Sequence, residues 1–443
     1  MLKSLKLDII TQQIQAFLRL MFHDLRQVRA ILRPELRREM SFLRFLMLGV
    51  AILETLTIFV ITLFGTSISA PQVIKGSSFF RLVFEAFPGF DHWCVDDRNF
   101  LFFMSLFMIF FIVIKNISSA ACYWKSSSFS EKVSQEIGSE IMRRYLYSPY
   151  LWHLSNQSRA TFQAMGWRSY LTTMVHSLLN MQSYTITTLF LFLGLMCVAP
   201  GLTLIVYLFT GGVGFLTYKL IRLSADRAGN NSATAYAREN TAVSNAVQGI
   251  REILIYRQQP VFLGAFSDAA RSGNNPRAYL NISSTIPSWV MEVCGFLIIS
   301  ATIVMLTHFW HMDMAQITKI VILLMLTSWR ALPSLNKVVN LVVVVRGVRP
   351  LSLPCLEMVK ALRAHNMELP PPPDPDFVFD REIRLENVSF RYPDSKDACL
   401  MNISLTIPKG ELIGFIGSSG GGKSTMIQTI FISNGSIFLP RYS

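Results

Sequence analysis

The sequence is poor in charged residues, which make up 16% of its 443 residues, against roughly 25% in an average soluble domain. It is rich in hydrophobic residues, at 51%, and its mean hydropathy is positive. It also lacks paired cysteines: the six cysteines are scattered, with no CxxC pair and no zinc-like spacing. The low charge and high hydrophobic content favour a membrane protein over an ordinary soluble domain. The cysteines are expected to be reduced or buried in lipid, and no disulfide framework is expected.

The first 40 residues lack the continuous apolar core of a cleavable signal peptide. On a helix, one side of this segment is apolar and lies opposite its basic positions. The apolar residues are Ile10, Ile14, Phe17, Leu18 and Met21. We therefore expect residues 1–40 to form an amphipathic helix that lies in the membrane interface and leads into the first span. A partly disordered basic arm is the alternative for residues 1–10.

Six runs of about 20 mainly apolar residues are long enough to cross the hydrocarbon core of a bilayer. They lie at about 43–64, 100–123, 171–197, 201–222, 288–310 and 316–340. A soluble all-helical core is an alternative for any one run, but six runs in a chain of this composition predict an integral membrane protein.

Lysine and arginine are concentrated in alternate connecting segments, as the positive-inside rule describes for cytoplasmic loops. Residues 1–44, 124–170 and 219–287 carry 23 of them, whereas the connections on the other side carry three, all in 65–99. We expect both termini and the two long loops to be cytoplasmic, in a chain of the cell (inner) membrane. The net charge of +13 then reflects topology, so nucleic acid is not an expected partner.

The two long loops look helical, since apolar residues recur near 3.6-residue spacing in 129–154 and 236–270. We expect helices 2 to 5 to extend beyond the bilayer, with separate surface helices as the alternative. The composition then changes at 369–377, "LPPPPDPDF". Four consecutive prolines favour an extended spacer and cannot continue a helix.

The segment after the prolines has strand character. It contains two strands, at 382–392 and 398–407, a turn, and a buried apolar strand at 411–416. This pattern predicts the start of a water-soluble domain.

The nine residues 417–425, "GSSGGGKST", match the phosphate-loop pattern G-x-x-x-x-G-K-[ST]. Glycines allow the backbone N–H groups to surround phosphates at the start of a helix. Lys423 is expected to reach the β- and γ-phosphates, and Ser424 to offer its hydroxyl to Mg²⁺. A glycine-rich turn that fits by chance is the alternative. The expected nucleotide-binding residues are Gly417, Ser418, Ser419, Gly420, Gly421, Gly422, Lys423, Ser424 and Thr425.

Six spans with long extensions, a linker and then "VSFRYPD…GFIGSSGGGKST" resemble the ATP-binding-cassette (ABC) exporters of the half-transporter type. The resemblance implies a mainly α, polytopic membrane protein. Its fold is a six-helix type I ABC exporter transmembrane domain, followed by the first strands and P-loop of an incomplete α/β nucleotide-binding domain. It also implies ATP and Mg²⁺ as cofactors, and a homodimer or a heterodimer with another half-transporter. Tyr392 matches the position where an aromatic ring stacks on adenine.

The same resemblance suggests four regions along the chain: an amphipathic elbow at 1–40, the transmembrane domain at 41–345, a linker at 346–376 and the nucleotide-binding domain at 377–443. Two segments resemble cytoplasmic coupling helices, at 145–160 and 246–262. The stretches "LGVAILETLTIFVITLFG" and "YLYSPYLWHLSNQSRATF" bear a weaker resemblance to flippases of lipid-linked oligosaccharides.

The sequence departs from the family after the phosphate loop. It shows no glutamine loop, LSGGQ-like signature, Walker B aspartate and glutamate, or switch histidine. We therefore expect an incomplete nucleotide domain, no catalytic residue in this chain, and no ATP hydrolysis by it alone. The alternatives are a non-catalytic membrane remnant or partner subunit, and a nucleotide-binding regulatory module.

Three basic residues lie within the sixth span, at Lys319, Arg330 and Lys337. At 100° per residue they fall on one side of a helix, which Pro333 can kink. They are expected to attract an anionic headgroup in a substrate cavity. Alternatively, the two lysines reach opposite interfaces and only Arg330 is within the membrane. Glu54, in the first span, either pairs with a basic residue or lines the cavity.

Overall fold

A computed structural model gives the fold of the chain. It describes residues 23–75, 96–147, 166–198, 200–309, 314–364, 380–392 and 397–433. The chain divides into two compact units, which are described separately below. The first comprises Met1–Ile141 and Ala160–Leu362, and the second comprises Met142–Arg159 and Arg363–Ser443.

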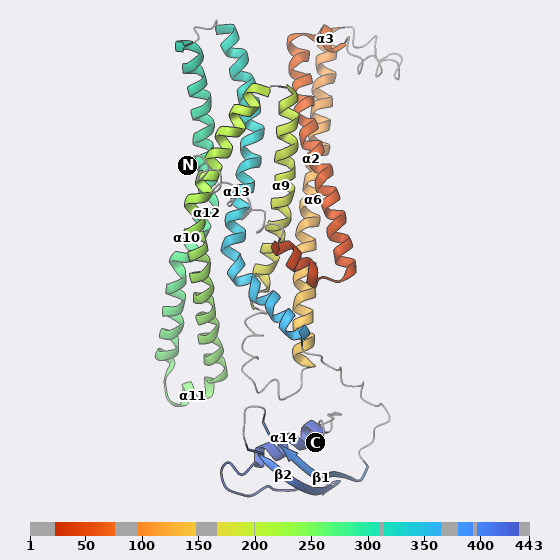
Figure 1. Cartoon of the computed structure of the whole chain (residues 1–443), viewed down its shortest axis with the longest axis vertical. Helices are drawn as coiled ribbons and strands as arrows, with labels where there is room; N and C mark the ends of the chain where they lie inside the picture. The colour runs from red at the N-terminus through yellow and green to blue at the C-terminus, as the bar shows by residue number, and fades with distance from the viewer. Residues whose placement is uncertain are drawn as a thin grey trace, which may run out of the picture. The chain divides into compact units, whose positions relative to one another are not determined.

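The first unit is built from six long helices, which run alongside one another in Figure 1. Among the described residues, each of the six contains a stretch that is long and apolar enough to cross a membrane. The prediction of six spans is therefore confirmed, although the candidate span in the last helix, Ala331–Arg363, overlaps only part of the predicted run at 316–340. The helices are α2 (Pro34–Ser69), α6 (Asp97–Leu146), α9 (Arg168–Val198), α10 (Pro200–Gln248), α12 (Gln259–Val304) and α13 (Met314–Ala364).

Several of these helices are longer than a bilayer requires. Helices α6 and α10 have 50 and 49 residues, and α12 has 46. At a rise of about 1.5 Å per residue, 50 residues extend about 75 Å, whereas the hydrocarbon core is about 30 Å thick. Within the described residues, the helical patterns at 129–146, 236–248 and 259–270 are thus continuations of the spans rather than separate surface helices.

A short helix, α11 (Ile250–Ile255), joins α10 to α12. It falls inside 246–262, where the sequence resembled a coupling helix. Most of the corresponding first segment, 145–160, lies outside the described residues, as does most of the expected N-terminal elbow. Residues 23–31 of that elbow are described and are helical.

Helix α13 is longer than expected. The predicted linker began at residue 346, but the helix continues to Ala364 with Pro333, Pro350 and Pro354 inside it. Two elements were not predicted at all: the short helix α3 (Pro71–Lys75) and a π-helical turn, η1 (Met305–Phe309), that ends α12.

Small apolar clusters hold the helices together, and large apolar side chains point outward. One cluster joins α10, α12 and α13 through Val206, Ile298, Leu324 and Ala331. Outward-facing residues along the spans include Phe102, Phe110, Ile117, Leu208 and Phe296, each more than half exposed. A soluble protein rarely exposes contiguous apolar surface on this scale, whereas a bilayer requires it.

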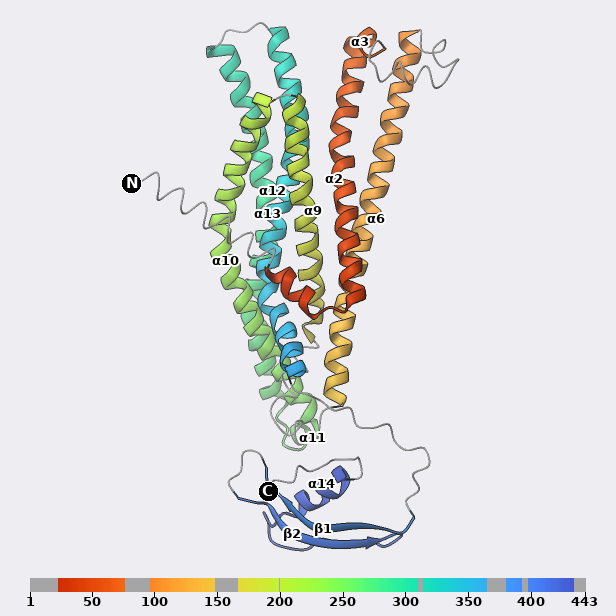
Figure 2. The same ribbon diagram turned by 45° about the vertical axis from the view of Figure 1, so that its right-hand side comes forward.

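The second unit contains two antiparallel strands, β1 (Glu382–Phe390) and β2 (Leu400–Pro408), followed by α14 (Lys423–Ser433). Leu385 and Leu400 of the sheet form a core with Met426 and Ile430 of the helix. Both views show α14 lying over the sheet (Figures 1 and 2). The first two predicted strands and the helix after the phosphate loop are therefore confirmed.

The third predicted strand, at 411–416, is not formed. Leu412 and Ile416 are fully exposed, at 101% and 100%. The apolar pattern of this segment suits the centre of a sheet, but the sheet described here consists of β1 and β2 alone. A strand exists through hydrogen bonds to a neighbouring strand, and this segment pairs with neither strand of the described sheet.

Candidate functional site

The phosphate loop makes a tight turn that requires glycine at particular positions. Gly420 and Gly422 have φ of +83° and +77°, in the left-handed region that side chains disfavour. Within the turn, the Gly421 N–H donates to the Ser418 carbonyl oxygen at 3.2 Å. A Cβ added at Gly422 would lie 3.0 Å from the Cys399 carbonyl oxygen. The backbone geometry of the turn therefore requires glycine at Gly420 and Gly422.

Replacing Gly422 by alanine is expected to weaken ATP binding, because the loop must give up this backbone conformation or move away from Cys399. The left-handed conformation alone costs alanine about 1–2 kcal/mol, or roughly tenfold in affinity. Titration of the purified chain with a fluorescent ATP analogue measures the effect. Gly414→Ala is the matched control, since no atom lies within 4 Å of its added Cβ. Equal affinities for the two variants would contradict the account.

The Lys423 ammonium lies across the loop. Its Nζ donates to the carbonyl oxygens of Gly417 and Ser418, at 2.8 Å and 2.5 Å. Lys423 and Ser424 also begin α14, whose N-terminal N–H groups carry a partial positive charge. Ser424 is exposed, so its hydroxyl is accessible to a metal ion.

Tyr392 is hydrogen-bonded to α14, the helix that follows the loop. Its hydroxyl lies 3.2 Å from the Thr425 hydroxyl and donates to Oε1 of Gln428, also at 3.2 Å. The Cys399 sulfur lies 3.3 Å from the same threonine oxygen. The Tyr392 ring meets Phe390 edge-on, with centroids 4.9 Å apart. The structure therefore brings Tyr392 and the loop together.

Sequence analysis missed Cys399 and Gln428 at this site. Gln428 follows Thr425 by three residues, so both lie on one side of α14, and this spacing was a usable signal. Cys399 had no comparable signal, since its contact depends on how β2 meets α14.

These residues fit a bound nucleotide with Mg²⁺. The turn of positive-φ glycines, the ammonium across it and the following helix N-terminus are features that suit a polyphosphate. Backbone N–H groups of the loop and Lys423 would hold the phosphates, and Ser424 would hold the metal through the nucleotide.

In the helical unit, Glu54 pairs with a basic residue. Its Oε1 accepts a hydrogen bond from Nζ of Lys115 on α6, at 2.9 Å. The two side chains are 22% and 10% exposed. Of the two roles considered for Glu54, the structure shows pairing. Lys115 was missed, although a lysine inside an apolar run signals a functional or paired charge.

The three basic residues of the sixth span all lie on α13. The side chains of Lys319 and Arg330 fall outside the described residues. The Lys337 ammonium lies over the Tyr184 ring of α9, 4.5 Å from its centroid. Lys337 therefore faces α9, whereas Glu54 is engaged between α2 and α6.

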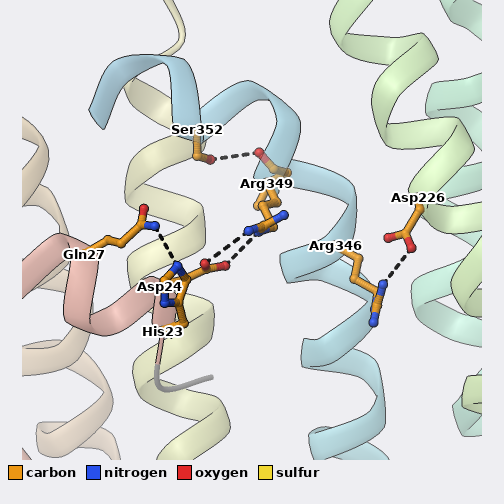
Figure 3. Close-up of polar contacts among 8 residues, drawn as sticks. His23, Asp24, Gln27, Asp226, Arg346, Arg349 and Ser352 are labelled. Carbon is orange, nitrogen blue, oxygen red and sulfur yellow. Dashed lines mark hydrogen bonds and ion pairs between the residues drawn. The ribbon is translucent and has the colours of Figure 1, made fainter. Parts of the chain in front are cut away.

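Two further arginines anchor the C-terminal part of α13 (Figure 3). Arg346 donates to Oδ2 of Asp226 on α10 at 2.6 Å and to the Tyr218 hydroxyl at 2.7 Å. Arg349 points to the other side and donates through Nε to Oδ2 of Asp24 at 2.9 Å. Helix α13 is thus linked both to α10 and to the helical residues 23–31.

Replacing Arg349 by methionine is expected to destabilise the protein by about 3 kcal/mol, because a buried carboxylate loses its partner. Asp24 is only 1% exposed, whereas the Arg349 side chain is 40% exposed. Asp24→Asn should therefore cost less, since Arg349 can reach water. Denaturant unfolding in detergent measures both variants. Equal losses of stability, or a larger loss in Asp24→Asn, would contradict this explanation from the difference in burial.

Comparison with known proteins finds a similarity to one family within the second unit. A family model described as ABC transporter matches residues 400–435. The Methionine import ATP-binding protein MetN 1 of Pectobacterium atrosepticum is 47% identical over 64 residues, which are 13% of this chain and 19% of that protein. A Putative ABC transporter ATP-binding protein of Methanosarcina mazei is 64% identical over 44 residues, which are 10% and 16% of the two chains.

The name of a third relative includes both an ATP-binding part and a permease part. A Putative multidrug export ATP-binding/permease protein of Staphylococcus aureus is 50% identical over 48 residues, which are 11% of this chain and 8% of that protein. The chain spans less than a fifth of the length of each of these three relatives. Six membrane-capable helices precede the matched segment. Together these findings confirm the resemblance to ABC transporters.

Proposed function

We propose that the chain is a subunit of an ATP-driven exporter or flippase that moves an amphipathic or lipid-linked substrate across a membrane. The observation that supports this most is the presence, in one chain, of six apolar helices and a phosphate loop with its lysine across it. Residues 417–425 are the proposed ATP site. The subunit works as a homodimer or as a heterodimer with another half-transporter, in the cell (inner) membrane with both termini cytoplasmic.

The chain's own part in the reaction is to hold and orient the nucleotide. Backbone N–H groups between Gly417 and Gly422 bind phosphate oxygens, and Lys423 balances their charge. The Tyr392 ring stacks on the adenine while its hydroxyl stays on α14. Bound Mg·ATP supplies the phosphoryl group for transfer to water. Hydrolysis also needs a group that orients that water, and we assign this role to no residue between 1 and 443.

The proposed substrate cavity is lined by the basic residues of α13. Lys337 is half of a cation–π pair with Tyr184, and such a pair keeps an ammonium within an apolar setting. With Arg330 and Lys319 it attracts the anionic headgroup of a lipid-linked substrate. Glu54 contributes to this region only through its ion pair with Lys115, which positions α2 against α6.

Nucleotide titration of the purified chain in detergent tests this proposal. We expect saturable, Mg²⁺-dependent binding of trinitrophenyl-ATP that ATP displaces, with no phosphate release by the chain alone. Absence of displaceable binding would overturn the nucleotide site. Steady phosphate release, abolished by Lys423→Ala, would show instead that the chain hydrolyses ATP unaided.

A further inference from the structure

A groove between α2 and α6 has no place in the proposed nucleotide site or substrate cavity. Its volume is about 370 Å³. Both views show these two helices side by side (Figures 1 and 2). The lining residues that matter for its chemistry are Glu39, Phe42, Trp124, Lys125, Ser128 and Lys132.

The groove lies where the apolar runs of both helices end. On α6 the apolar run ends at residue 123, and Trp124 and Lys125 follow directly; on α2, Phe42 immediately precedes the run that begins at residue 43. Trp124 is 75% exposed and Phe42 is 53% exposed. Exposed tryptophan and basic residues at the ends of spans mark the level of lipid headgroups.

One of the two lysines in the groove keeps an unneutralised charge. Lys132 donates to Oε1 of Glu39 at 2.7 Å. The Lys125 ammonium lies 5.1 Å from the centroid of the Phe42 ring, and within the described ranges no carboxylate pairs with it. Lys125 and the exposed Ser128 hydroxyl therefore offer a charge and a donor to an anion.

Ion pairs link α2, and Arg33 directly before it, to α6 along the groove. Glu54 pairs with Lys115 above it, Glu39 pairs with Lys132 within it, and Arg33 pairs with Glu136 at its other end. A site whose walls are fixed before binding loses less entropy when a ligand enters.

We propose that this groove binds the headgroup phosphate of an anionic phospholipid. Lys125 and Ser128 contact the phosphate, and Trp124 lies at the level of the glycerol backbone. The acyl chains run along the exposed apolar faces of the two helices, where Phe45 and Ile117 are 71% and 63% exposed. A free phosphate ion would not use this apolar surface. This lipid site does not depend on ATP binding. Either proposal, the lipid site or the proposed function, can therefore be wrong while the other holds.

Native mass spectrometry of the full chain, titrated with dioleoyl phosphatidylglycerol or dioleoyl phosphatidylcholine, tests the proposal. We expect tighter binding of phosphatidylglycerol. Lys125→Gln should weaken phosphatidylglycerol binding about fivefold, since one basic residue near a headgroup contributes about 1 kcal/mol. Binding of phosphatidylcholine should not change. Lys125→Arg should retain the wild-type affinity, and Arg271→Gln, which removes an exposed charge from α12, is the matched control.

Three results would overturn the proposal. These are equal binding of the two lipids by the wild type, an unchanged phosphatidylglycerol affinity in Lys125→Gln, and an equal loss in Arg271→Gln. Millimolar inorganic phosphate is a further arm. If it displaces phosphatidylglycerol, the groove is a general anion site and not a lipid site. Lys125 is exposed, and matching circular dichroism spectra will show that its variants fold.

Discussion

Replacing Lys115 by methionine is expected to lower the free energy of unfolding by about 3–5 kcal/mol, because Glu54 would lose its ammonium partner inside the spans. The pair is held at 2.9 Å, and the lysine side chain is only 10% exposed. Water cannot readily replace the lost hydrogen bond at this depth. Reversible unfolding in mixed micelles measures the loss.

The same two helices provide a matched control. Lys132 pairs with Glu39 at 2.7 Å, but these side chains are 51% and 40% exposed. Exposed ion pairs contribute about 0–1 kcal/mol, so Lys132→Met should have a small effect. The double variant Glu54→Leu/Lys115→Met should recover much of the stability, because it removes the carboxylate together with its ammonium partner. Equal losses at the two lysines, or a double variant less stable than Lys115→Met, would contradict this account.

Replacing Lys423 by alanine is expected to weaken ATP binding by about ten- to hundredfold. The ammonium lies across the loop, 2.8 Å from the Gly417 carbonyl oxygen. From this position it can donate its hydrogen bonds to a phosphate instead. A hydrogen bond to a charged group contributes about 1.5–3 kcal/mol, which gives this range. Displacement of a fluorescent ATP analogue from the purified chain measures it.

Lys409→Ala is the control for this prediction, since Lys409 is an exposed lysine of the same unit outside the loop. Its ATP affinity should match the wild type. If Lys423→Ala binds ATP as tightly as Lys409→Ala, the loop is not the nucleotide site.

The membrane spans and the phosphate loop were predictable because both depend on local sequence. A run of 20 apolar residues already satisfies the bilayer, and the Gly420 and Gly422 turns need glycine whatever surrounds them. The extent of α13 was not predictable. Its C-terminal part is held by Arg346, Arg349 and Ser352, which contact α10, residues 23–31 and the Tyr170 carbonyl oxygen. These contacts link positions far apart in the chain.

The sequence predicted an ion pair for Glu54 only as one of two possible roles, and it did not predict which basic residue would be the partner. Glu54 and its partner are 61 positions apart, and the sequence offered several other basic residues within the spans. The choice depends on which helix lies beside α2. The prediction of a third strand was wrong for a related reason. The apolar pattern of 411–416 predicts burial, but burial requires neighbouring strands. The described sheet has only β1 and β2, and Leu412 is exposed.

The central claim is that ATP bound at residues 417–425 drives movement of a substrate by a subunit built from the six spans. The most direct test is the initial rate of transport of a fluorescent lipid-linked oligosaccharide into inside-out vesicles from cells that carry the chain together with an intact half-transporter as its partner. We predict ATP-dependent transport by the wild type and, in Lys423→Ala, a rate no higher than that without ATP. An ATP-dependent rate that Lys423→Ala leaves unchanged would contradict the claim.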